Sequence, residues 1–183
     1  MLNFAHIHTM VLVSNPLLWY PYTPGAWSNF FSAETSASAG LVGLLFVAIS
    51  INLPKIVVVP QLVKRAAKAL VALMGVLIAS TLCLVPGQRF FFLGTELVVV
   101  GLLVWIGASW QENASSRDNP FIARRMRWIL LVLTQLSVIP TFLAGVSILM
   151  GFGGALYWLV AGTIFSFVAA MVDAWALLIE ICR

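Results

Sequence analysis

Five apolar stretches, each long enough to cross a lipid bilayer, constrain the fold of this chain more than any other feature. A hydrocarbon core about 30 Å thick needs roughly 20 apolar residues at a helical rise of 1.5 Å each. The stretches lack the two-residue alternation of barrel strands, which favours helices. Because 62% of the 183 residues are hydrophobic and 9% are charged, the chain has too much apolar surface for one soluble core. We predict an all-α polytopic membrane helix bundle, a single membrane domain over 1–183, with five spans at about 36–53, 66–85, 90–110, 127–150 and 155–181.

The basic residues predict the orientation of this bundle. When the spans alternate in direction, nine of the ten Lys and Arg residues fall on one side of the membrane and Arg89 falls on the other. The positive-inside rule then places the N-terminus outside and the C-terminus in the cytoplasm. Basic loops beside anionic lipid headgroups also account for the net charge of +4, so no nucleic-acid partner is expected. Two interpretations are open for the run that contains Arg124, Arg125 and Arg127. The run either binds lipid headgroups or a partner, or it only sets the orientation of the chain in the membrane.

Residues 1–25 are predicted to form an external segment on the membrane interface. Prolines interrupt its short apolar runs, and it contains no Lys or Arg. A helix is expected to begin near Pro24, because proline fits the first helical turn. His6 and His8 form a pair of the kind that binds metals, but a site needs three or four ligands and no third is near them. We therefore expect no metal site.

Acidic side chains inside the predicted spans are the first candidates for a functional site, because ionisable groups at this depth are costly. Glu96 follows the turn at residues 86–89 and is expected to lie level with residues 79–81 of the neighbouring span. We consider proton transfer, cation coordination and gating for Glu96. The competing interpretation is a packing contact with Ser80, Thr81 or Arg89.

Two further acids have structural and functional interpretations. For Asp173, an ion pair with Lys68 or Arg127 that holds the fifth span against the basic loops is favoured. Glu34 lies near the beginning of the first span, where a carboxylate interacts favourably with the helix dipole. Alternatively, copies of Glu34 form an acidic ring at the mouth of an oligomer and attract cations.

The fourth predicted span carries polar residues at mid-depth, and Gln135 is a candidate functional residue among them. Counted back from the turn at residues 151–154, Pro140 and Thr141 come level with residues 163–166 of the fifth span. This alignment predicts a polar belt between the fourth and fifth spans.

Small residues recur on the first span at three- or four-residue spacing, centred on Ser36, Gly40 and Gly43. Such a face lets two membrane helices approach closely, and it also suits the lining of a pore. Gly94 and Gly101 form a weaker copy on the third span. The sequence leaves open whether the partner helix belongs to the same chain or to another copy.

No catalytic constellation is evident. The chain has no His-Glu-x-x-His, no Gly-x-Ser-x-Gly and no phosphate-binding glycine loop, and no histidine lies within a predicted span to ligate haem. Cys83 and Cys182 are expected at opposite ends of the bundle, too far apart for a disulfide. We expect neither catalytic residues nor a cofactor.

The run Gly43–Leu53 (GLLFVAISINL), which follows a small-residue stretch and an acidic residue, resembles the first membrane segment of a group of small bacterial integral membrane proteins. Some members of that group are labelled as modulators of a membrane-bound AAA protease. The resemblance covers the first span only. It implies a location in the bacterial inner membrane and brings no catalytic residues.

Together these features predict a non-enzymatic accessory or regulatory subunit that acts by helix–helix association in the lipid bilayer. Its expected partner is a second copy of the chain or another membrane protein. The alternative is a small oligomeric ion channel, with Glu34 or Glu96 and the Ser/Gly face of the first span near the pore.

Overall fold

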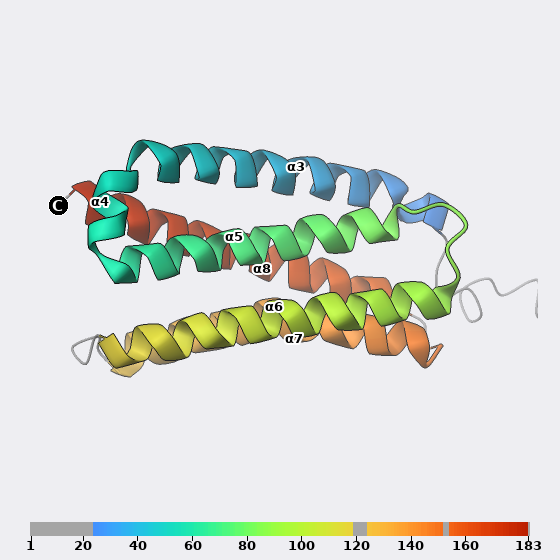
Figure 1. Cartoon of the computed structure of the whole chain (residues 1–183). Helices are drawn as coiled ribbons and strands as arrows, with labels where there is room; N and C mark the ends of the chain where they lie inside the picture. Colours follow the sequence, from blue (N-terminus) through green and yellow to red (C-terminus); the bar gives the residue numbers. More distant parts are fainter. Residues whose placement is uncertain (1–23, 119–123, 152–153, 183) are drawn as a thin grey trace, which may run out of the picture.

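The computed structural model describes residues 24–118, 124–151 and 154–182, and every regular element in these ranges is a helix. Within these ranges five helices are long and apolar enough to cross a membrane, so by length and composition the chain is a multi-pass membrane protein (Figure 1). The prediction of an all-α polytopic bundle is confirmed. The elements are α3 (Pro24–Ile51), α4 (Leu53–Val58), α5 (Pro60–Cys83), α6 (Phe90–Asp118), α7 (Arg124–Leu149) and α8 (Ala155–Cys182).

Four of the long helices form a ring, and the fifth packs on its outside. Within the ring α5 packs against α6, α6 against α7, α7 against α8, and α8 against α5. Helix α3 packs mainly against α5 and lies along one edge of the bundle in Figure 1. Only 11% of the membrane-spanning part of α3 is buried, against 44% for α5 and for α8. Helix α3 therefore exposes most of its surface.

The two ends of the bundle differ in their connections. One end, which we call the turn end, holds the links from α5 to α6 and from α7 to α8. Gly87 (φ 71°) and Gly151 (φ 70°) adopt backbone angles there that favour glycine. The opposite end, which we call the basic end, holds α4, the beginning of α7 and the end of α8 (Figure 1). Lys64, Arg65 and Lys68 lie in the first turns of α5 at the basic end.

Proline lies in the first turn of α3, α4 and α5. Helix α3 begins at Pro24, as expected from the sequence. Helix α5 begins at Pro60 rather than near Ala66, because Val59 is extended (φ −112°, ψ 100°) and proline fits the first helical position. The external segment expected at residues 1–25, with its histidine pair, lies outside the described residues up to residue 23.

Glycine contacts bring α6 and α7 close together. A Cβ built on Gly145 would lie 2.8 Å from the backbone nitrogen of Val98 and 2.9 Å from the carbonyl oxygen of Gly94. One built on Gly101 would lie 3.3 Å from the backbone of Phe142. The small residues of the third predicted span are therefore used for packing inside this chain.

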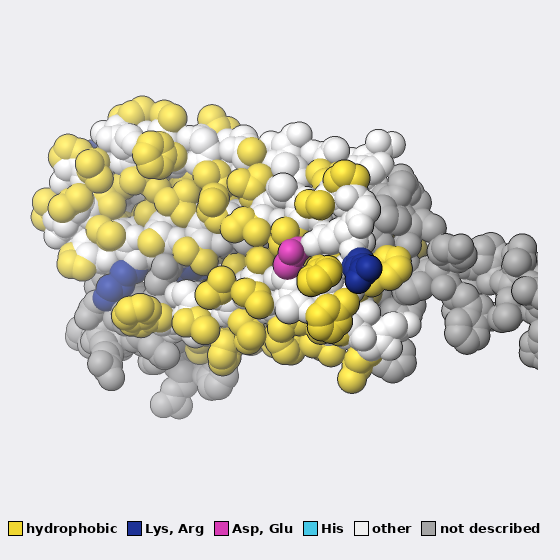
Figure 2. Space-filling view, turned by 45° about the vertical axis from the view of Figure 1, so that its right-hand side comes forward, with side chains coloured by type: hydrophobic (Ala, Val, Ile, Leu, Met, Phe, Trp, Pro, Cys, Tyr) yellow, Lys and Arg dark blue, Asp and Glu magenta, His cyan; other side chains and the backbone are white. Residues whose placement is uncertain are grey.

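The outside of the bundle is strongly apolar. Figure 2 shows a face on which hydrophobic side chains extend over most of the described surface and charged side chains are sparse. Large apolar side chains such as Leu44 (70% exposed), Leu103 (64%) and Trp175 (65%) point outwards. Lipid chains satisfy such a surface, since they are as apolar as the side chains themselves.

Candidate functional site

The small-residue face predicted on the first span points away from the rest of the bundle. Ser36, Gly40 and Gly43 are exposed, and a Cβ built on either glycine meets no atom within 4 Å among the described residues. At Gly75, Gly94, Gly101, Gly145 and Gly162, each on a helix of the ring, the nearest atom to such a Cβ lies only 2.8–3.3 Å away. We call the exposed positions Ser36, Gly40 and Gly43 the glycine face of α3.

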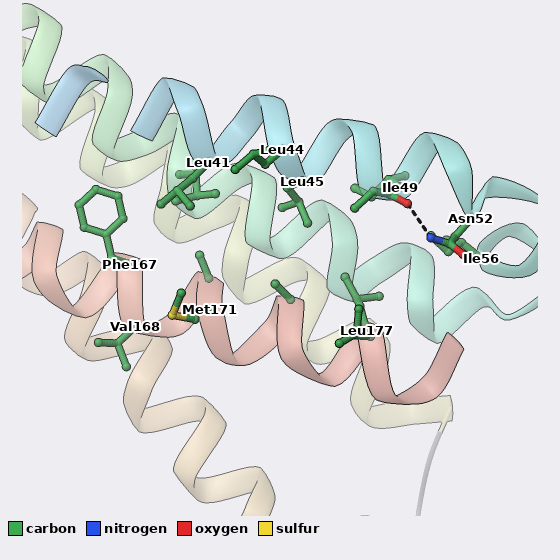
Figure 3. Close-up of a pocket in the computed structure, with 15 residues that line it drawn as sticks. Leu41, Leu44, Leu45, Ile49, Asn52, Ile56, Phe167, Val168, Met171 and Leu177 are labelled. Carbon is green, nitrogen blue, oxygen red and sulfur yellow. Dashed lines mark hydrogen bonds between the residues drawn. The ribbon is translucent and has the colours of Figure 1, made fainter. Parts of the chain in front are cut away.

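An apolar groove of about 390 Å³ lies beside α3 (Figure 3). Leu41, Leu45 and Ile49 line it from α3, across from Phe167 and Met171 of α8. Asn52 is a polar exception in the lining, and its Nδ2 donates a hydrogen bond to the carbonyl oxygen of Ala48 at 3.0 Å. The groove provides apolar contact but few polar groups to orient a ligand. Sequence reasoning missed it, because it depends on how α3 and α8 diverge.

Glu34 lies on the side of α3 opposite the glycine face. Nine positions separate Glu34 from Gly43, which is about 2.5 helical turns. Glu34 is 7% exposed and hydrogen-bonds Thr163 of α8, while its Oε2 has no partner among the described residues. The structure therefore does not bring Glu34 and the glycine face to one surface, and a pore lined by that face would not contain this carboxyl group.

Asp173 forms an ion pair with Lys68, one of the two partners considered from the sequence. The Lys68 Nζ and Asp173 Oδ2 atoms lie 3.8 Å apart, and the two side chains are 14% and 8% exposed. The pair joins α5 to α8 near the basic end. The side chains of Arg124, Arg125 and Arg127 lie outside the described residues, although the three positions form the beginning of α7.

Hydroxyl groups line the interior between α7 and α8. Thr134, Ser137, Thr163 and Ser166 are all buried. The Ser166 Oγ donates to the carbonyl oxygen of Ser137 at 3.4 Å, and the Ser137 Oγ donates to that of Thr134 at 2.8 Å. A Cβ on Gly162 would meet the Thr141 Oγ1 at 2.8 Å and the Pro140 Cβ at 3.4 Å. The predicted polar belt between the two spans is confirmed.

Glu96 and Gln135 make polar contacts away from this belt. The Gln88 Nε2 donates to the Glu96 Oε2 near the turn end. The hydroxyls of Ser80 and Thr81, considered as partners of Glu96, instead donate to the carbonyl oxygens of Val76 and Leu77 in their own helix. Helical Ser and Thr commonly make this local bond. The Gln135 Oε1 accepts a hydrogen bond from the Trp105 Nε1 at 3.0 Å, which joins α7 to α6.

Comparisons with protein-family models, with curated proteins and with solved structures give no match. The resemblance of Gly43–Leu53 to a bacterial membrane protein family stays a prediction.

Proposed function

We propose that this protein is a non-enzymatic membrane subunit that acts by helix–helix association, with the glycine face of α3 as its interface. One observation carries the proposal: Gly40 and Gly43 have no close neighbour, whereas five glycines of the ring lie at tight helix contacts. In a bilayer, helices associate through close packing rather than through a hydrophobic driving force, and small residues permit that packing. An exposed face of this kind favours a partner helix.

A second copy of the chain is the partner that we propose for this face. Two copies of α3 would present the same small residues to each other about a two-fold axis, so that Gly40 and Gly43 pack on their counterparts. The peripheral position of α3 leaves room for such an approach without unpacking the ring, since only 11% of its spanning part is buried.

We expect Gly43→Leu to weaken self-association without unfolding the chain. A leucine here would separate the two α3 helices, yet it meets open space within its own chain. The dissociation constant is expected to rise about ten-fold or more, equal to about 1.4 kcal/mol. Native mass spectrometry of protein extracted gently from its membrane measures this change.

Ala37→Leu is the matched control, because Ala37 is exposed on the same helix about 100° around from Ser36. It should leave the assembly unchanged. If Gly43→Leu and wild type show the same oligomeric state, this face is not the interface. A stoichiometric complex with a different protein would support the accessory function and replace the second copy as partner.

We also propose that the protein lies in a bacterial inner membrane with its basic end in the cytoplasm and its N-terminus outside. The grouping of Lys64, Arg65 and Lys68 at one end, with Arg89 at the other, supports this orientation.

A cysteine introduced at position 88 is expected to react with a membrane-impermeant maleimide added outside intact cells. One introduced at position 114 is expected to react only after the membrane is opened. The opposite labelling pattern would show that the protein has the opposite orientation in the membrane.

A further inference from the structure

Two small cavities follow each other along the centre of the α5–α8 ring. The first, of about 20 Å³, is lined by residues of all four helices, including the hydroxyl-bearing Ser137, Thr141, Thr163 and Ser166. The second, of about 10 Å³, is lined by Lys68, Thr134, Ser137 and Asp173 among others. A water molecule needs about 10–15 Å³ of such space and two to four polar partners. The first cavity therefore accommodates one water, and the second is at the lower limit.

The cavities adjoin, because their linings share residues. Ala72, Val104, Ser137 and Val138 line both. Ser137 supplies a hydroxyl group at the junction, and the carbonyl oxygen of Ser137 accepts from the Ser166 Oγ. The linings are otherwise mainly apolar, so the hydroxyl and charged side chains form a single row from Thr163 to Asp173 along the centre of the ring.

An ionisable group lies at each end of this row of polar side chains. At the basic end, the second cavity reaches the Lys68–Asp173 pair. Toward the turn end, Thr163 of the first cavity is hydrogen-bonded to Glu34, and Cys83 of α5 lies beside that carboxyl group. Glu34 belongs to the peripheral helix α3, yet it points into the bundle.

The environment of the Glu34 Oε2 atom indicates a function independently of the two cavities. The atom is buried without a hydrogen-bond partner among the described residues, on a side chain that is 7% exposed. Burying a carboxyl oxygen unpaired is costly, and a packing contact does not require it. A water molecule or a transferable proton would satisfy it.

We propose that the centre of the ring conducts protons between Glu34 and the Lys68–Asp173 pair. The hydroxyl groups of Thr163 and Ser137 donate to the carbonyl oxygens of Val160 and Thr134, so each turns toward a water molecule in the cavity to pass a proton on. A hydroxyl group or a water molecule both donates and accepts a hydrogen bond, and in this way exchanges one proton for the next. A proton that binds Glu34 displaces another through Thr163, the first cavity, Ser137 and the second cavity to Asp173. One proton enters and one leaves, and no group is consumed. Chains of acids and water carry protons in this way across other membrane proteins.

Proton flux into liposomes tests the proposal on the full chain. The purified protein is reconstituted into vesicles that contain a pH-sensitive dye, and a potassium gradient with valinomycin provides the driving potential. Wild type is expected to acidify the vesicle lumen faster than the leak in protein-free vesicles. Glu34→Gln, which keeps the side-chain shape but removes the titratable group, is expected to bring the rate close to that of protein-free vesicles.

Glu96→Gln is the matched control, since Glu96 lies near the same end but contacts Gln88 outside the cavities. It should conduct at the wild-type rate. Thr163→Val, of similar shape, interrupts the path at the first cavity and provides a second test if Glu34→Gln does not fold. A wild-type rate equal to that of empty vesicles, or wild-type rates in folded Glu34→Gln or Thr163→Val, would overturn the proposal.

The pathway lies within one chain and does not depend on the association proposed for α3. Gly43→Leu is therefore expected to leave the proton flux per chain unchanged while it disperses the oligomer. If Gly43→Leu abolishes flux and Glu34→Gln does not, the pore lies between copies and the intramolecular pathway is wrong.

Discussion

Replacing Gly145 by alanine is expected to lower the free energy of unfolding by about 3 kcal/mol, the upper part of the range for overpacked cores. The added Cβ would lie 2.8 Å from the backbone nitrogen of Val98 and 2.9 Å from the carbonyl oxygen of Gly94. Both neighbours are backbone atoms of α6, so rotation of a side chain cannot relieve the contact. Helices α6 and α7 must move apart, which loosens the packing along their whole contact. Equilibrium unfolding in detergent micelles measures the loss.

Gly107→Ala and Gly43→Ala are the controls for this substitution. A Cβ at Gly107 would meet Val71 at an ordinary 3.5 Å, and one at Gly43 would meet nothing within 4 Å. Since alanine is about 1 kcal/mol better than glycine inside a helix, both variants are expected to be neutral or slightly more stable. A Gly145→Ala protein as stable as these two would show that α6 and α7 are less closely packed than in this structure.

The membrane-spanning helices were predictable from the sequence for a physical reason. A backbone that crosses a bilayer must satisfy its polar groups within its own segment, so a long apolar run becomes a helix. The prolines at positions 24 and 60 then fix where α3 and α5 begin.

The sequence could not show which face of a membrane helix points inwards. Gly94 and Gly101 on α6 and Gly40 and Gly43 on α3 are all glycines within apolar helices, and the sequence around them is similar in polarity. The first pair nevertheless packs against α7, whereas a Cβ on either glycine of the second pair meets no atom within 4 Å. Lipid and protein interior are equally apolar, so no polarity difference distinguishes the two cases. For the same reason, the groove between α3 and α8 could not be predicted from the sequence.

The partner of an acidic residue was predictable from the sequence only where a basic residue lies within reach on a neighbouring helix. Asp173 pairs with Lys68, because a buried carboxylate needs a cation within reach and one lies on the adjacent helix. Glu34 was expected to interact with its own helix dipole or with other copies, whereas the structure gives it Thr163 of α8 as a partner. That contact depends on how α3 is rotated about its own axis, and no pattern in the sequence indicates this rotation.

Lys68→Met is expected to destabilise the protein by about 3–5 kcal/mol, the usual cost of removing one partner from a buried ion pair. The substitution keeps most of the side-chain volume but removes the ammonium group of Lys68 from beside the Asp173 carboxylate, which is 8% exposed. Lys64→Met on the same helix is the control, since Lys64 is partly exposed and surface ion pairs contribute little. Urea or sodium dodecyl sulfate titration of helicity measures the difference.

The double variant Lys68→Met/Asp173→Leu separates the ion pair from the packing around it. Because replacing both charged partners by apolar groups removes the uncompensated charge, the double variant is expected to recover most of the stability that Lys68→Met loses. It is also expected to lose proton flux, because the second cavity then lacks its two charged lining residues. A double variant as unstable as Lys68→Met would mean that the loss comes from packing. Recovery of stability without flux would instead show that this pair is retained for conduction rather than for folding.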